Sequence, residues 1–154
     1  MCEVNICMPM STRELFARMI RCEAEGEGIE GMKAVATVCM NRVHIAYGEY
    51  QRVNQGDLRK VLEQMCQFSC HKTVIGGQSN PQNVWSLPPE EIHYEIADWA
   101  LAGNKVPVVG ECLWYMNPYS PRCPRFFPYN RTGYWHHRIH DHCFYKPTRL
   151  YAET

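Results

Sequence analysis

The segment that most constrains the fold runs from Glu30 to Val43. Apolar side chains recur there at intervals of three and four residues with few interruptions: Met32, Val35, Ala36, Cys39, Met40 and Val43. This spacing is typical of the buried face of an α-helix. We therefore predict a central, buried helix from about Glu30, against which the rest of the chain packs.

Another helix is predicted immediately before the central one. Ser11 supplies a hydroxyl and Glu14 a carboxylate three residues later, which is the pattern of a capping box. One face then follows at helical spacing: Phe16, Met19, Ile20 and, as its last member, Glu23. Gly26 and Gly28 are expected to end this helix. A carboxylate therefore continues an otherwise apolar face.

Weaker signals complete the expected domain. Helices are predicted after Asp57 and after Pro88-Pro89, the second ending at Gly103. Residues 113–116 and 143–145 indicate short strands. Residues 66–87 and the proline-rich stretch 117–134 indicate loops, and a loop as long as the second is often functional. The expected fold class is α+β, mainly helical, with a small β region.

Composition excludes several classes of protein. The chain has 154 residues, enough for one compact domain. Its formal net charge is zero and it has no basic block, which argues against nucleic acid as a partner. No run of 18 apolar residues is present, so no membrane span is expected. Residues 1–10 lack the basic and apolar regions of a secretory signal peptide.

The nine cysteines are odd in number and irregular in spacing. Without a signal peptide, they indicate mostly buried thiols rather than a secreted disulfide scaffold. The cluster His136, His137, His140 and His142 with Cys123 and Cys143 lacks the paired short spacing of structural zinc sites. We therefore expect no metal and no cofactor. A nucleophilic pair of Cys22 or Cys143 with a histidine is formally open, but nothing in the spacing sets its geometry.

Glu23 is the sharpest candidate for chemistry. Burial favours the protonated form of a carboxylic acid, which can then donate a proton to a glycosidic oxygen. From spacing alone, however, an exposed glutamate at the end of a helix is a better explanation than a catalytic acid. Glu25 and Glu27 are like-charged neighbours, and Glu27 and Glu30 also suit the positive end of the following helix. A role for Glu27 as a second catalytic carboxylate stays open.

Polar and aromatic side chains that suit sugar recognition occur at two places. Gln67 and Phe68 lie in the middle loop, and Trp114, Tyr115 and Asn117 lie in and after the first predicted strand. Aromatic rings stack on apolar sugar faces, but they also build cores. Asn117 could bind a sugar amide or close a turn before Pro118.

These segments together resemble a known family of bacterial cell wall hydrolases, which includes the spore cortex-lytic enzymes SleB and CwlJ. The resemblance is carried, in order, by residues 21–31, Ala34-Val35-Ala36, Asn41-Arg42-Val43, Gln67-Phe68, residues 113–118 and residues 142–148. It covers residues 11–148, which makes 1–10 and 149–154 terminal extensions of the catalytic domain. The glutamate-rich residues 23–28 and the ending 142–145 are more similar to the CwlJ branch, as is the expected lack of a signal peptide and of a wall-binding domain.

The resemblance implies a lysozyme-like domain in which Glu23 is catalytic and Gln67, Phe68, Tyr115 and His142 are cleft residues. It implies action on spore cortex peptidoglycan, which contains muramic lactam, during germination. It also implies synthesis in the mother-cell cytoplasm, deposition at the boundary of coat and cortex, dependence on the coat protein GerQ and a response to calcium dipicolinate. This chain departs from the family in its many thiols and in an enlarged loop at residues 120–140.

Two chemistries fit such an enzyme. A hydrolase needs a second carboxylate to activate water or attack the sugar. A lytic transglycosylase needs one glutamate, which protonates the leaving oxygen and then deprotonates the C6 hydroxyl of the same muramyl unit. We favour the second, because only Glu23 continues an apolar face. The alternative outside enzymes is a glycan-binding spore coat protein without activity.

Overall fold

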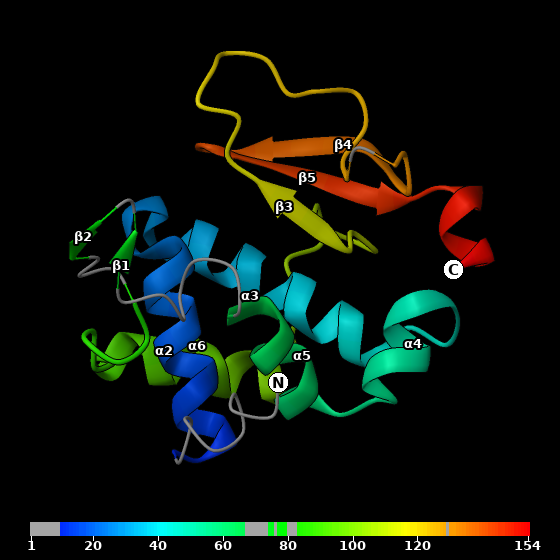
Figure 1. Cartoon of the computed structure of the whole chain (residues 1–154). Helices are drawn as coiled ribbons and strands as arrows, with labels where there is room; N and C mark the ends of the chain where they lie inside the picture. The colour runs from blue at the N-terminus through cyan, green and yellow to red at the C-terminus, as the bar shows by residue number, and fades with distance from the viewer. Residues whose placement is uncertain (1–9, 67–73, 76, 80–82, 129) are drawn as a thin grey trace.

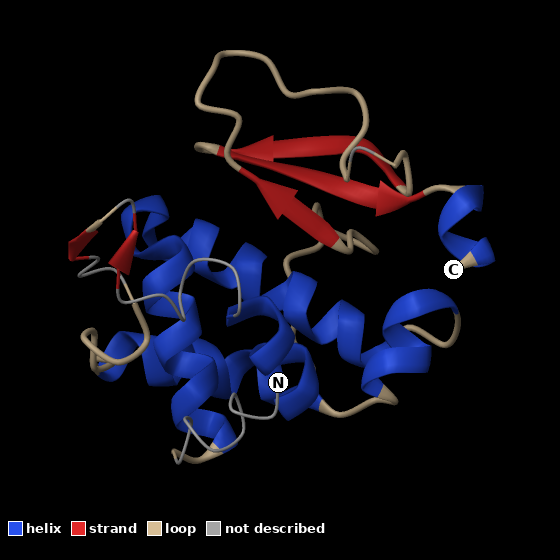
Figure 2. Cartoon of the chain, viewed as in Figure 1, coloured by secondary structure: helices blue, strands red, loops and turns tan. Residues whose placement is uncertain are grey.

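The computed structural model describes residues 10–66, 74–75, 77–79, 83–128 and 130–154. A layer of helices lies beneath a small sheet (Figures 1 and 2). The principal helices are α2 (Thr12–Ala24), α3 (Gly28–His44), α5 (Leu58–Cys66) and α6 (Glu91–Leu101). The sheet is antiparallel in the order β3-β5-β4, with β3 at Trp114–Met116, β4 at Gly133–Ile139 and β5 at His142–Pro147. The predicted α+β class is confirmed.

Helix α3 is the central buried helix that its apolar repeat predicted, and it begins at Gly28. Most of its residues are buried over about three turns: Gly31, Met32, Ala34, Val35, Ala36, Thr37, Val38, Cys39, Met40 and Asn41. The buried amide of Asn41 is hydrogen-bonded, because its Nδ2 donates to the carbonyls of Gly110 and Cys112 over 2.8 Å each. This contact holds the segment leading into β3 against the end of α3.

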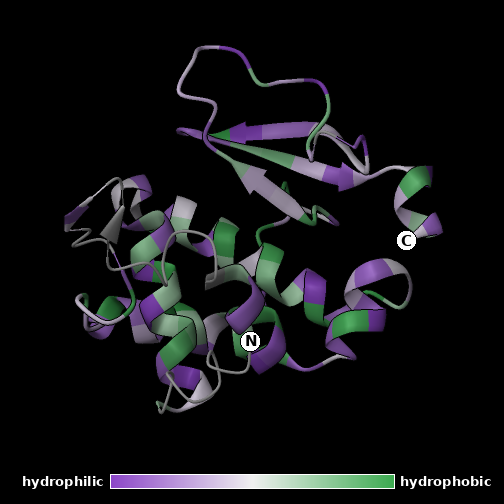
Figure 3. Cartoon of the chain, in the orientation of Figure 1, coloured by the Kyte–Doolittle hydropathy of each residue, from purple (hydrophilic) through white to green (hydrophobic). Residues whose placement is uncertain are grey.

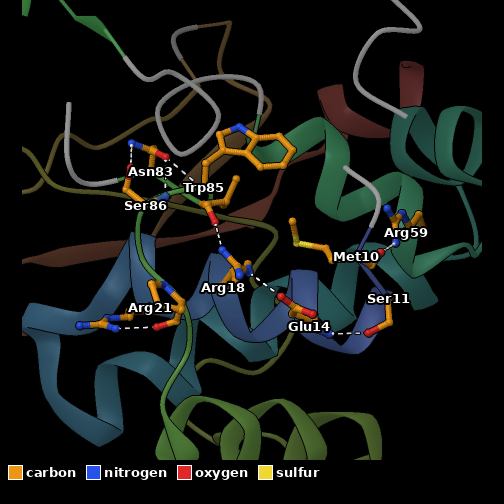
Figure 4. A network of polar contacts seen from close by, with 11 residues as sticks. Met10, Ser11, Glu14, Arg18, Arg21, Arg59, Asn83, Trp85 and Ser86 are labelled. Carbon is orange, nitrogen blue, oxygen red and sulfur yellow. Dashed lines mark hydrogen bonds and ion pairs between the residues drawn. The ribbon is translucent and has the colours of Figure 1, made fainter. Parts of the chain in front are cut away.

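Helix α2 begins as predicted but with half of the capping box. The backbone N–H of Glu14 donates to Oγ of Ser11 over 3.1 Å. The Glu14 carboxylate instead accepts from Nε of Arg18 over 2.8 Å. Arg18 also donates to the carbonyl of Val84, and Arg21 donates to the carbonyl of Pro88 (Figure 4). Side chains of α2 therefore position the segment that precedes α6.

Strands β3 and β5 were predicted and pair directly, with Tyr115 opposite Phe144 and Trp114 opposite Tyr145. Strand β4 was not predicted, because residues 117–134 and the enlarged region 120–140 were expected to be loop. It lies at the edge of the sheet, and its residues are largely hydrophilic (Figure 3). An edge strand of this kind carries little of the apolar alternation by which strands are predicted.

Four further elements lie where regular structure was not expected. Helix α4 spans Gly48–Asn54, and a hairpin joins β1 (Val74–Ile75) to β2 (Gln78–Ser79). The 3-10 helix η2 (Arg149–Glu153) lies beside α4 and buries Tyr151, whose hydroxyl accepts from the N–H of Tyr50 over 3.0 Å. The segment 149–153 therefore packs against α4.

The cysteines differ from the expectation of buried thiols. Cys123 and Cys143 form a disulfide that ties the loop after β3 to strand β5, with 5.9 Å between their Cα atoms. Cys22 is also disulfide-bonded. Among the described residues, Cys39 and Cys112 are free and buried. In this same part of the chain, no helix has the length and apolar character needed to cross a membrane.

Candidate active site

A cleft of about 410 Å³ lies between the helices and the sheet. Its walls come from α2, α3, α4, α5, β3 and the loop before β4. The lining residues are Glu23, Arg42, Glu49, Tyr50, Gln64, Met65, Trp114, Tyr115, Phe127 and Pro128. Aromatic rings and a few polar groups thus share one concave surface, as is usual in ligand sites.

Glu23 reaches this cleft from the last turn of α2. Its neighbours Cys22 and Ala24 are buried, whereas Glu23 itself is half-buried. The hydroxyl of Tyr115 on β3 donates a hydrogen bond to Oε1 of Glu23 over 2.8 Å. Burial, and then the charge of Glu23, raise the pKa of Tyr115 well above its ordinary value. The phenol therefore stays protonated and acts as a permanent donor to one carboxylate oxygen.

His142 contacts Tyr115 but is not itself among the residues that line the cleft. Its ring meets Tyr115 edge-on, with 5.1 Å between centroids. Its Nδ1 lies 3.6 Å from Oε1 of Glu27, too far for a hydrogen bond. Burial lowers the pKa of His142, although the carboxylates of Glu27 and Glu23 act in the opposite direction. The buried imidazole is therefore neutral near pH 7 and holds the back of the Tyr115 ring.

Glu27 lies at the N-cap position of α3, the positive end of the helix dipole that the sequence suggested for it. Its side chain makes no cap hydrogen bond, and its Oε1 accepts from the backbone N–H of Asp141 over 3.0 Å. The absence of a side chain at Gly31 makes room for it, because a Cβ there would lie 2.3 Å from Cβ of Glu27. Glu27 therefore joins α3 to the turn between β4 and β5. It does not line the cleft, so the geometry favours a structural role.

Glu25, which was expected to act only as a like-charged neighbour of Glu23, is directed elsewhere. Its carboxylate accepts from Nε of Arg21 over 2.9 Å, at the surface. The acidic side chain that shares the cleft with Glu23 is Glu49 on α4. Sequence reasoning missed Glu49 because α4 was not predicted.

Arg42 on α3 supplies the positive charge of the cleft. Its Nε donates to the carbonyl of Leu113 over 2.7 Å, and its Cζ lies 4.6 Å from the centroid of the Tyr50 ring. The motif Asn41-Arg42-Val43 was a signal for this residue, but the sequence did not distinguish a cleft residue from a structural one. Tyr50, Gln64 and Phe127 carried no such signal.

The other residues that were predicted to belong to the site do not all line the cleft. Trp114 and Tyr115 line the cleft with Glu23. Asn117 does not: its Oδ1 accepts from the N–H of Tyr119 over 2.7 Å, which closes a turn. Gln67 and Phe68 lie outside the described residues.

The disulfides bear on the proposed cysteine–histidine pair. Cys22 and Cys143 are both disulfide-bonded, so neither has the free thiol that a nucleophile needs. A cysteine–histidine nucleophile is therefore excluded at these two cysteines.

The chain is similar in sequence to known proteins of one family. Curated relatives, each described as cell wall hydrolase CwlJ, come from Bacillus subtilis (29% identical over 92% of this chain and 87% of the relative) and Halalkalibacterium halodurans (27% over 88% and 85%). A third, from Oceanobacillus iheyensis, is 26% identical over 88% of this chain and 86% of its own length. No solved structure matches the chain. The family model described as Cell Wall Hydrolase matches residues 26–145, beginning just after Glu23. The chain belongs to the cell wall hydrolase family.

Proposed function

We propose that this protein cleaves the glycan strands of peptidoglycan as a lytic transglycosylase, with Glu23 as its single acid and base, in a lysozyme-like domain. One observation carries the proposal. Glu23 lines a cleft between helices and sheet, and Tyr115 donates to its Oε1 over 2.8 Å. That bond fixes the orientation of the carboxyl group that carries the reacting proton.

The reaction balances without water. The Glu23 carboxylic acid gives its proton to the glycosidic oxygen as the bond from this oxygen to C1 of muramic acid breaks. The C6 hydroxyl of the same sugar then forms a bond to C1. Its proton passes to the Glu23 carboxylate, which restores the acid. The products are a new 4-hydroxyl end and a 1,6-anhydromuramyl end.

A hydrolase is the second candidate, and the position of Glu49 favours it. Glu49 lines the same cleft as Glu23. A second carboxylate can activate a water molecule or attack C1, and the product is then a reducing sugar. Glu27, the second carboxylate considered from the sequence, is held by Asp141 outside the cleft lining.

The proposed substrate is spore cortex peptidoglycan with muramic lactam, cleaved during germination. The relatives named CwlJ and the resemblance to spore cortex-lytic enzymes support this setting. The proposal includes synthesis in the mother-cell cytoplasm, location at the boundary of coat and cortex, and GerQ as coat partner.

The test is digestion of purified cortex peptidoglycan followed by mass spectrometry of the released muropeptides. Anhydromuramyl ends are expected, and reducing ends alone would refute the transglycosylase. Glu23→Gln should abolish release, whereas Glu49→Gln should leave it within about twofold if one glutamate suffices. Loss in Glu49→Gln together with reducing ends would establish the hydrolase.

Glu25→Gln is the matched control, because Glu25 is exposed and lies two positions away from Glu23. It should behave as the wild type. Cortex binding without any release of muropeptides by the wild-type protein would favour the non-catalytic glycan-binding coat protein. Release by Glu23→Gln at the wild-type rate would refute the assignment of Glu23.

A further inference from the structure

We propose that Arg42 forms an anion site in the cleft, which binds a carboxylate carried by the lactyl or peptide substituent of a muramic acid unit. The inference rests on the proposed function for its substrate, and it adds a group by which that substrate is recognised. Three observations carry it: how the guanidinium is held, what it does not pair with, and what else lines the cleft.

The guanidinium is fixed along one edge and one face. Nε donates to the carbonyl of Leu113 over 2.7 Å, and Cζ lies 4.6 Å from the centroid of the Tyr50 ring. Among the described residues, the Nη groups have no hydrogen-bond acceptor. Because the guanidinium is planar, fixing Nε and one face also fixes the direction of the remaining N–H groups. The site is thus preorganised before a ligand arrives.

Arg42 forms no ion pair within the described part of the chain, although Glu23 and Glu49 line the same cleft. Other arginines of the helical layer do pair. The bridges are Arg13–Asp98, Arg18–Glu14, Arg21–Glu25 and Arg59–Glu63. A half-buried guanidinium whose charge is not neutralised by a neighbour attracts an anionic ligand.

The positive charge of Arg42 influences the tyrosines on both walls of the cleft. Burial raises the pKa values of Tyr50 and Tyr115, and the charge of Arg42 acts against this rise in both. Its field is therefore present on both sides of the cleft, at Tyr50 from α4 and at Tyr115 from β3.

The rest of the lining suits a sugar chain. Trp114, Tyr50 and Phe127 offer aromatic surface, on which sugar rings stack. The anionic groups of peptidoglycan are carboxylates, carried by the lactyl group of muramic acid and by its peptide. Arginine binds a carboxylate through two parallel N–H bonds. The Nη edge of Arg42 has this geometry and is not engaged by the described residues.

Arg42 is assigned to binding rather than to the chemical step. The transition state of glycosidic cleavage carries positive charge on the sugar. A fixed positive charge nearby does not stabilise it. Replacement of Arg42 should therefore raise KM more than it lowers kcat.

The test compares two ligands in a Glu23→Gln background, which prevents turnover. One is a tetrasaccharide of alternating N-acetylglucosamine and N-acetylmuramic acid with free lactyl carboxylates. The other is the same tetrasaccharide with carboxamides in their place. Arg42→Met should weaken calorimetric binding of the carboxylate ligand about 10- to 100-fold and that of the carboxamide less than about twofold. Arg42→Lys should restore part of the loss, because it keeps the charge without the planar fork.

Arg52→Met is the control, because Arg52 is exposed on α4 and donates to the carbonyl of Thr154. It should change neither affinity. Equal losses for both ligands in Arg42→Met would overturn the inference and assign Arg42 to holding Leu113 and Tyr50. No loss for the carboxylate ligand, or no binding of either ligand to the Glu23→Gln protein, would also overturn it.

Failure of the proposed function gives a different result. If the wild type releases no muropeptides but the two ligands are still discriminated through Arg42, the anion site stands and the chemistry is wrong. If the wild type releases anhydromuramyl ends and no discrimination is seen, Glu23 stands and the anion site is wrong.

Discussion

The hydroxyl of Tyr115 on β3 donates to Oε1 of Glu23 at the end of α2 over 2.8 Å, across 92 positions of the chain. The bond joins the two layers of the fold at the point where the cleft opens. It makes the orientation of the Glu23 carboxyl group depend on the position of the sheet, and so on the contacts that hold the sheet.

Tyr115→Phe tests this bond directly. The Glu23 carboxyl group becomes negatively charged as it gives up its proton, and loss of a hydrogen bond to a charged group costs about 1.5–3 kcal/mol, which corresponds to a fall of about 10- to 100-fold in kcat. The phenyl ring keeps its contacts with His142 and Phe144, so the thermal midpoint should change little. Initial rates of muropeptide release give the measurement. Tyr119→Phe, on a ring that is 89% exposed, is the control, and equal rates in both variants would contradict the role of Tyr115.

Gly31→Ala tests the position of Glu27. A Cβ at Gly31 would lie 2.3 Å from Cβ of Glu27 and displace it from Asp141. Overpacking of this kind costs about 1–3 kcal/mol, which exceeds the gain of about 1 kcal/mol in helix propensity. Urea unfolding should show a loss of stability. Gly26→Ala is the matched control, because nothing lies within 4 Å of its Cβ. A stability of Gly31→Ala equal to that of Gly26→Ala would disprove the close contact.

The stability contributed by His142 should depend on pH. Burial lowers its pKa below the ordinary value of 6.5, so the unfolded chain takes up the proton first as the pH falls. The contribution is complete above about pH 6.5 and is lost as the pH falls through the folded-state pKa. The advantage of the wild type over His142→Asn should therefore shrink between pH 7 and pH 5 in urea titrations.

Gln51→Ala is the control for this titration, because Gln51 is exposed and carries no titratable group. Its curve should run parallel to that of the wild type over the whole range. A constant difference between the wild type and His142→Asn from pH 7 to pH 5 would show that His142 does not titrate with folding.

Loss of the Cys123–Cys143 disulfide should weaken the sheet. It closes a loop of 20 positions, for which the loss of chain entropy in the unfolded state is worth about 3 kcal/mol. Cys123→Ser should lower the free energy of unfolding by about this amount. Alkylation of the native protein before reduction, followed by peptide mapping, checks the pairing. Labelling of both cysteines without a reductant would show that they are thiols.

Local pattern was sufficient for much of the helical layer. Helix α3 was predicted because burial imposes a period on its sequence, and the start of α2 because Ser11 is a typical N-cap residue. In the sheet, β3 and β5 were predicted as strands, whereas their pairing came from the structure. Helix α4 and strand β4 were not predicted. Only two residues of the short helix α4, Tyr50 and Asn54, are buried, so its sequence carries little period.

Glu23 as a candidate, its helix and the family resemblance could be read from the sequence alone. What surrounds Glu23 could not, because its contacts come from parts of the chain that are distant in sequence. Only the folded chain brings the Tyr115 hydroxyl to Oε1 of Glu23 and places Glu49 and Arg42 in the same cleft. It also places the Glu27 carboxylate against the N–H of Asp141 and Asn117 in a turn. Periodicity reports which face of an element is buried, whereas the packing of sheet on helices decides which side chains meet there.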